Sequence, residues 1–405
     1  SPALVAQSIG GGGGWIAQAA GEVDLGSYRT LESKNQSNTV DVTTNGSIQT
    51  FGTNSTGILA QSIGGGGGFI GINTASDYRM LLGATYSDGS NNSSDVSVDN
   101  KGTISTTGNN SAALIAQSIG GGGGSAAINW KVTDDRNGDE STPLLLLGGA
   151  SQIIAKSGNV TVTNQSNLTT RGPGSPALLL QSIAGGGGSV QSLEDAYAGE
   201  ILFGYLSHPI ASGLQFSSGS INFTSLNGSI VSTSGERSAA AILQSIGGGG
   251  GWGLVNSSTY SALGIESSIG LPFIGTATGG SITANVDGTL QTTGNSSPAF
   301  IAQSIGGGGG FAGNTTTAGY LGANYIEAAS VGIAGSSNIL MPEACQFGSC
   351  DVVAVEQSVL VDIQGDLITT GSTSPVMLVQ AIGGGGGRLG TVGGNAQMGT
   401  INSTG

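Results

Sequence analysis

The chain has 405 residues, of which 77 are glycine, and only 8% of its residues are charged. Its apolar share of 37% is enough for a large buried core, whereas a disordered chain is poor in apolar residues and rich in charge. The formal net charge of −14 argues against a nucleic-acid partner, whose phosphates need basic patches, and against an anionic membrane surface.

A motif that ends in a glycine run occurs seven times along the chain. Each copy joins Ser, Pro or Ala residues to a short apolar run, a glutamine, Ser or Ala, an isoleucine and the glycines. Internal repetition of this kind is typical of proteins whose units stack on their neighbours. The copies occupy residues 1–14, 55–68, 111–124, 175–188, 238–251, 297–310 and 374–387.

A second block precedes copies two to seven and alternates apolar with polar residues, which predicts half-buried β-strands. In its first version, residues 40–52, Asn45-Gly46 is expected to form a turn. Block and motif together predict strand, turn, strand, glycine-rich turn and strand, most clearly over the 29 residues 40–68. We expect three such strands to make about one coil of a parallel β-helix.

The spacers between these repeated parts vary in sequence and length, as in residues 15–39, 69–94 and 311–358. Some are strongly apolar, such as residues 143–154. A loop that simply left the stack and returned to it would not need so many apolar residues. We therefore expect each spacer to form a second, degenerate coil with loops, and an insert that leaves the β-helix is the alternative.

The motif glutamines are expected to form a structural ladder. Stacking places equivalent residues of successive coils about 4.8 Å apart. A glutamine amide can then donate to one neighbour and accept from the other. The residues of this ladder are Gln7, Gln61, Gln117, Gln181, Gln244, Gln303 and Gln380.

The glycine runs are interpreted sterically, because a residue without Cβ lets backbones or bulky side chains approach closely. Stacked ladders with full backbone pairing, or a polyglycine-II-like bundle, would offset the poor strand propensity of glycine. No run is followed by the Lys-Ser/Thr of a phosphate-binding loop. Aromatic residues follow four runs and are expected either in the core or over a neighbouring glycine surface; they are Trp15, Phe69, Trp252 and Phe311.

No catalytic, cofactor or metal site is expected. The lone His208 has no nucleophile motif around it, and the acidic segment 134–140 lacks the EF-hand pattern, so both are interpreted as loops. A column of threonines, which includes Thr50 and Thr106, resembles an ice-binding row, but its sequence spacing is too irregular. Cys345 and Cys350 are expected to close a small disulfide loop, and two unpaired thiols are the alternative.

The motif resembles a known family. Ala-Gln-Ser-Ile with five glycines, at 60–68, 116–124 and 302–310, and the strand at 46–52 resemble passenger repeats of large bacterial autotransporter proteins. The resemblance covers essentially the whole chain, with Ala184 and Ala381 as departures. It implies a right-handed parallel β-helix outside a Gram-negative cell, contacting the outer membrane only through a β-barrel domain elsewhere in the full protein. It carries over no catalytic residue.

The sequence thus predicts an all-β, right-handed parallel β-helix (solenoid) with Gly-rich turns and variable inserted loops, as one continuous segment, 1–405, of a longer chain. We expect an extracellular or cell-surface fibre or stalk, without catalysis, that mediates adhesion, aggregation or matrix formation. Its expected partners are copies of itself, a host or neighbouring-cell surface, or a matrix polysaccharide. The alternatives are a self-polymerising filament subunit, a β-helix carbohydrate-active enzyme and an ice-binding protein.

Overall fold

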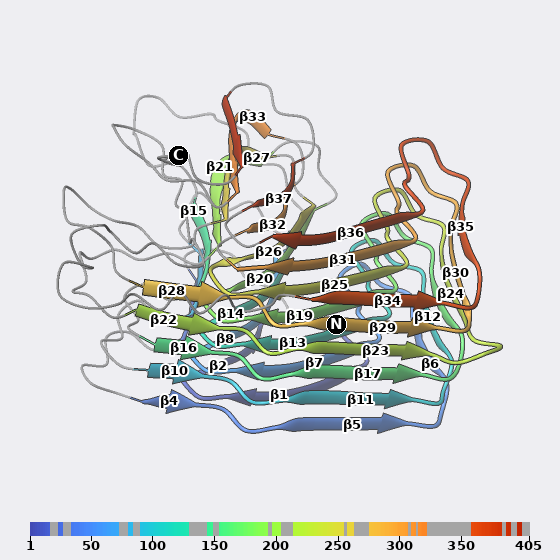
Figure 1. Ribbon diagram of the computed structural model, residues 1–405, viewed down its shortest axis with the longest axis horizontal. Helices are drawn as coiled ribbons and strands as arrows, with labels where there is room; N and C mark the ends of the chain where they lie inside the picture. Colours follow the sequence, from blue (N-terminus) through green and yellow to red (C-terminus); the bar gives the residue numbers. More distant parts are fainter. Residues whose placement is uncertain are drawn as a thin grey trace.

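The computed structural model is built from parallel β-strands in six stacked sheets (Figure 1). The residues that it describes contain no helix, and hence none long and apolar enough to cross a membrane. The all-β class and the parallel pairing predicted from the sequence are therefore confirmed. The described residues are 1–16, 23–26, 34–72, 80–83, 90–128, 144–148, 154–192, 197–203, 214–254, 257–262, 275–306, 309–312, 315–321, 358–382, 386–389 and 395–398.

The chain visits the six sheets in a constant order, and one such passage is called a circuit here. The first circuit contains β1 (Leu4–Ile9), β2 (Gly13–Ile16), β3 (Val23–Leu25), β4 (Asn35–Gln36), β5 (Val40–Thr44) and β6 (Ile48–Thr50). The second circuit begins with β7 (Ile58–Ile63), which pairs with β1 in register. Each sheet is named below after its strand in the first circuit.

Three sheets have seven strands each. The β1 sheet continues through β7, β13 (Leu114–Ile119), β19 (Leu178–Ile183), β25 (Ala241–Ile246), β31 (Phe300–Ile305) and β36 (Met377–Ile382). The β2 sheet continues through β8 (Gly67–Ile72), β14 (Gly123–Ile128), β20 (Gly187–Ser192), β26 (Gly250–Leu254), β32 (Gly309–Ala312) and β37 (Gly386–Leu389). The β3 sheet continues through β9 (Met80–Leu82), β15 (Leu144–Leu147), β21 (Tyr197–Phe203), β27 (Ser257–Ala262), β33 (Thr315–Leu321) and β38 (Asn395–Met398).

The other three sheets have five or six strands among the described residues. The β4 sheet continues through β10 (Ser90–Asn92), β16 (Ile154–Lys156), β22 (Leu214–Ser217) and β28 (Gly275–Thr278). The β5 sheet continues through β11 (Val96–Asn100), β17 (Val160–Asn164), β23 (Ile221–Ser225), β29 (Ile282–Val286) and β34 (Val359–Ile363). The β6 sheet continues through β12 (Ile104–Thr106), β18 (Leu168–Thr170), β24 (Ile230–Thr233), β30 (Thr289–Thr292) and β35 (Leu367–Thr369).

Each repeat makes a single circuit, so the predicted 29-residue coil with a second, degenerate coil is wrong. Gln7 lies opposite Gln61, 54 residues later, and Gln303 lies opposite Gln380, 77 residues later. The apolar spacers supply strands of the same circuit, as β15 does within residues 143–154. Because the differences in repeat length fall between the strands, the register is continuous in every sheet except the β3 sheet. In that sheet the register shifts between Tyr197 and Glu200 and between Ser257 and Thr259.

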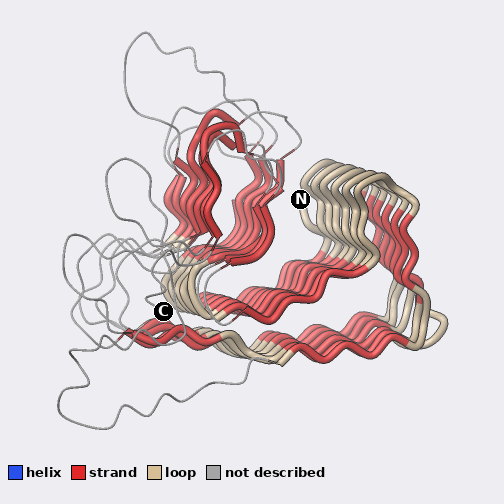
Figure 2. Tube along the Cα trace, turned by 45° about the horizontal axis from the view of Figure 1, so that its top comes forward, coloured by secondary structure: helices blue, strands red, loops and turns tan. Residues whose placement is uncertain are grey.

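The strands of successive circuits lie directly over one another (Figure 2), and the core lies on both sides of the β1 sheet. On one face, Ile58 packs with apolar residues of the β5 and β6 sheets, such as Val98 and Ile104. On the other face, Leu59 belongs to a cluster that includes Phe69 of the β2 sheet. Strands buried on both faces are apolar without alternation, which accounts for the apolar run in every motif.

Three of the four aromatic residues that follow the glycine runs belong to this second part of the core, whereas Trp15 in the first circuit is 43% exposed. Phe69 and Trp252 are buried in the cluster of Leu59, and Phe311 packs against it. The rings of Trp252 and Phe311 stack with their centroids 4.3 Å apart. Of the two predicted roles, core packing is therefore the one that the structure supports.

Candidate functional site: polar columns along the stack

The seven motif glutamines form one continuous hydrogen-bonded column. Gln7 Nε2 donates to Oε1 of Gln61 at 2.6 Å, and each later pair repeats this bond at 2.6–2.9 Å. In five of the seven, Nε2 also donates to the carbonyl oxygen seven residues further on, at 3.0 Å from Gln181 to Gly188. The buried amide groups thus form their hydrogen bonds with other groups of the protein, so this column is a structural element.

A serine column, which the sequence analysis did not identify, links two layers of the stack. Ser62 Oγ lies 2.8 Å from Ser37 Oγ and donates to the Asn38 carbonyl, so that the β1 sheet is tied to the segment before β5. The same contact joins Ser118 to Ser93, and it recurs in two further circuits. The recurrence of serine directly after six of the seven motif glutamines was the signal that could have revealed it.

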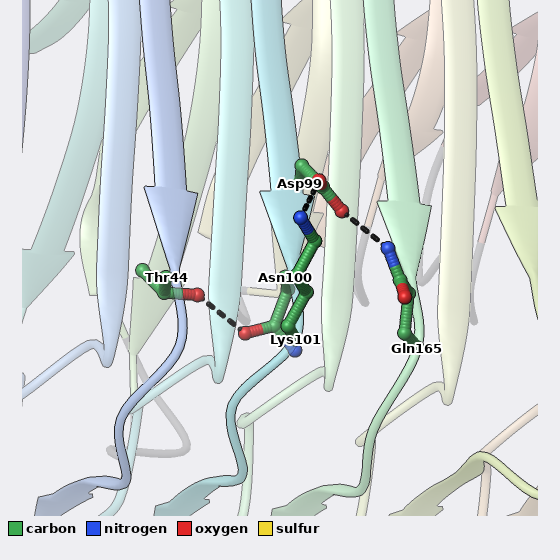
Figure 3. Close-up of polar contacts among 5 residues, drawn as sticks. All are labelled: Thr44, Asp99, Asn100, Lys101 and Gln165. Atoms are coloured by element: carbon green, nitrogen blue, oxygen red, sulfur yellow. Dashed lines mark hydrogen bonds and ion pairs between the residues drawn. The ribbon is translucent and has the colours of Figure 1, made fainter.

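A third polar column follows the ends of the β5-sheet strands. Thr44 Oγ1 donates to Asn100 Oδ1 at 2.7 Å (Figure 3). Asn100 Nδ2 in turn donates to Asn164 Oδ1 at 2.8 Å. Asn100 and Asn164 are fully buried. The amide ladder principle inferred for glutamine therefore applies to asparagine as well.

The threonine column faces the interior of the stack. Thr106, Thr170 and Thr292 are fully buried, and each hydroxyl donates to the carbonyl oxygen five residues further on. These hydroxyl groups are therefore not presented to solvent. The threonine column therefore does not supply the exposed hydroxyl row that an ice-binding surface needs.

The glycine runs follow a backbone path that other residues rarely adopt. Gly66, Gly67 and Gly68 have φ angles of +92°, +121° and +137°. A Cβ atom on Gly65 would lie 2.7 Å from the backbone of Gly121 in the next circuit. The steric interpretation therefore accounts for the runs. Ala184 stands at the first position of its run, where no positive φ is required.

The outward residues of the β5 sheet form polar columns that face solvent. Within this exposed layer, Asp99 accepts a hydrogen bond from Gln165 Nε2 at 2.8 Å and pairs with Lys101 Nζ at 3.0 Å (Figure 3). The hydrogen bond from Lys101, and then that from Gln165, lower the pKa of the Asp99 carboxyl below its ordinary value. This pair stays on the surface, where it has only a small effect on stability.

Several predicted features fall outside the described residues. They are the disulfide of Cys345 and Cys350, the loop with His208 and the acidic segment 134–140. Within the described ranges, no three His, Cys, Asp or Glu residues lie close enough together to hold a metal ion.

Comparisons with known proteins identified no relative of this chain. No protein-family model, no curated protein and no solved structure matches the chain.

Proposed function

We propose that this chain is a structural segment of an extracellular or bacterial cell-surface fibre or stalk that mediates adhesion, aggregation or matrix formation. In this proposal the stacked circuits form a right-handed parallel β-helix, a solenoid of the kind found in autotransporter passengers, and it has no catalytic role. The handedness follows the strong general preference for right-handed connections between parallel strands.

One observation carries the proposal: seven equivalent motifs stack in register whatever the length of the spacer between them. Continuous backbone pairing and the glutamine column then run along a single axis. Solenoids of this type are stabilised by contacts between neighbouring repeats. Further repeats can therefore lengthen the rod while the packing within the core stays the same. A rod that holds surface groups away from a cell needs that property.

Deletion of one whole circuit tests the stacking. Removal of residues 111–174 joins Asn110 to Ser175, the equivalent of Ser111 in the next circuit. We expect the shortened chain to keep its β-sheet circular dichroism per residue and a cooperative urea transition. Removal of residues 111–128 alone, which deletes only β13 and β14, leaves an incomplete circuit and is expected to disrupt folding.

Surface display tests the function. The chain, fused to a heterologous outer-membrane anchor on a non-adherent bacterium, is expected to promote cell settling and attachment, and the shortened chain is expected to do so as well. Cells that display the folded chain but neither aggregate nor attach would contradict the proposal. Long filaments of the purified chain in negative-stain images would instead favour a self-polymerising subunit.

A further inference from the structure

We infer that the solvent-facing side of the β5 sheet binds a neutral, extended polysaccharide that lies along the stacking axis. This inference rests on the proposed function, because it names the surface of the fibre that contacts a matrix or a neighbouring cell. The six strands of this sheet form one broad layer (Figure 1), whose alternate residues point away from the core.

The composition of this face selects the chemistry of the ligand. Its twelve outward positions contain eight neutral Ser, Thr or Asn residues, three Asp, one Leu and neither a basic nor an aromatic residue. Lys101, directly after β11, is paired with Asp99, so the face does not attract anionic polymers, and its other aspartates repel them. The outward positions, in two columns, are Asp41, Ser97, Thr161, Asn222, Thr283 and Leu360, and then Thr43, Asp99, Thr163, Thr224, Asn285 and Asp362.

Several neutral hydrogen-bonding groups of this face are free for a ligand, whereas Asp99 and Asp362 accept hydrogen bonds from Gln165 and Gln364. The inner glutamine, serine, threonine and asparagine columns are all bonded to protein groups. Among the described residues, the side chains of Thr161, Thr163, Asn222 and Thr224 bond to no other protein group and are exposed or half-buried. Hydroxyl and carboxamide groups both donate and accept, as sugar hydroxyls do.

The spacing of these groups matches a repeating polymer. Equivalent side chains lie about 4.8 Å apart along the axis, and the two columns lie about 6.6 Å apart. An extended β-linked hexose polymer repeats its hydroxyl groups at an interval close to one circuit. Successive sugars of an extended β-1,4-linked chain alternate in orientation, so every second circuit meets an equivalent sugar, and weak contacts along one polymer add up to useful avidity.

The size of the face argues against a second copy as the occupant. Five residues by six strands cover about 400 Å², whereas a stable protein interface buries about 800 Å² on each partner. A linear polymer needs only a narrow, regular strip. The flat polar strip therefore fits a polysaccharide better than another protein.

Binding to amorphous cellulose, a neutral β-1,4-glucan, tests the inference with the full 405-residue chain. We expect the chain to sediment with the glucan at both low and high salt, and not with alginate, which is anionic. The double variant Thr163→Lys/Thr224→Lys places bulk and charge at the centre of the face and should weaken binding by about tenfold, equivalent to roughly one net hydrogen bond.

The control carries the same changes on the neighbouring sheet. Thr169→Lys/Ser232→Lys lies in the same two circuits but in the outward column of the β6 sheet, and it should leave binding within about twofold. Thr163→Ala/Thr224→Ala keeps the strands unaltered and should weaken binding by a smaller factor in the same direction. Circular dichroism verifies that each variant is folded.

Three results would overturn the inference. If the folded chain does not bind the glucan, the inference that this face binds a polysaccharide is refuted. The proposed fibre function is tested separately, by the settling of cells that display the chain. Equal loss of binding in the β5-sheet variant and its β6-sheet control shows that the site is not on the proposed face. Equal binding to alginate contradicts the neutral chemistry of the ligand.

Discussion

Replacement of one glutamine in the middle of the column is expected to destabilise the stack strongly. Gln181 accepts from Gln117, donates to Gln244 and donates to the Gly188 carbonyl, and it is fully buried. Gln181→Leu keeps the side chain nearly as large but removes all three bonds. It therefore leaves polar groups of three other residues without this partner.

The magnitude follows from those orphaned groups. Each buried group that loses its hydrogen bond costs roughly 1–3 kcal/mol, and Gln117 keeps a weak bond to Gly124 at 3.5 Å. Burial of the leucine side chain returns about 1.5–3 kcal/mol. We therefore expect the free energy of unfolding to fall by about 2–4 kcal/mol.

Urea denaturation followed by circular dichroism measures this change, and Gln7→Leu is the matched control. Gln7 has a neighbour on one side only and is half-buried, so its replacement should cost less than about 1 kcal/mol. If the two variants unfold at the same urea concentration as the unaltered chain, the column does not stabilise the stack. Equal destabilisation by both would show that burial at the column centre is irrelevant.

Two further changes probe the glycine runs and the surface carboxylate. Gly187→Ala introduces a Cβ that meets the Gly250 carbonyl oxygen at a φ of +137° and should cost about 2 kcal/mol or more in unfolding free energy, whereas Gly46→Ala, with open space around it, should be nearly neutral in the same urea titration. Lys101→Met should raise the pKa of Asp99 toward its ordinary value in a carboxyl NMR titration. The Lys101 contact lowers that pKa in the folded state, so the small stability it adds is present above the ordinary pKa and is lost as the pH falls through the lowered one. An unchanged Asp99 pKa in the variant would contradict this assignment.

Much of the strand structure could be predicted from local pattern. The alternation in Val40–Thr44 and the recurrence of Gln7, Gln61 and their counterparts indicated parallel strands with like residues opposite one another. Identical positions recur in every repeat, and only an in-register stack brings all of them together. The glutamine column follows from that register, because an amide both donates and accepts.

The closure of the circuit could not be predicted in the same way. The β3 and β4 sheets come from spacers without a common sequence, such as Met80–Leu82 and Leu144–Leu147. Each of these strands pairs with a strand one whole repeat away, so the local sequence pattern does not indicate which strands pair. The contact between Ser37 and Ser62 could not be predicted for the same reason, because the two serines belong to opposite layers of the stack.

The sequence by itself therefore determined the strands of the repeated blocks and motifs and which of their residues repeat along the axis. Only the tertiary structure decided how many strands complete a circuit and which polar positions face inward. Thr163 and Thr170 are both threonines of short strands, but Thr163 faces solvent and Thr170 faces the core. Only Thr170 is therefore buried. That choice depends on how layers distant in the chain pack together, which is a property of the whole stack.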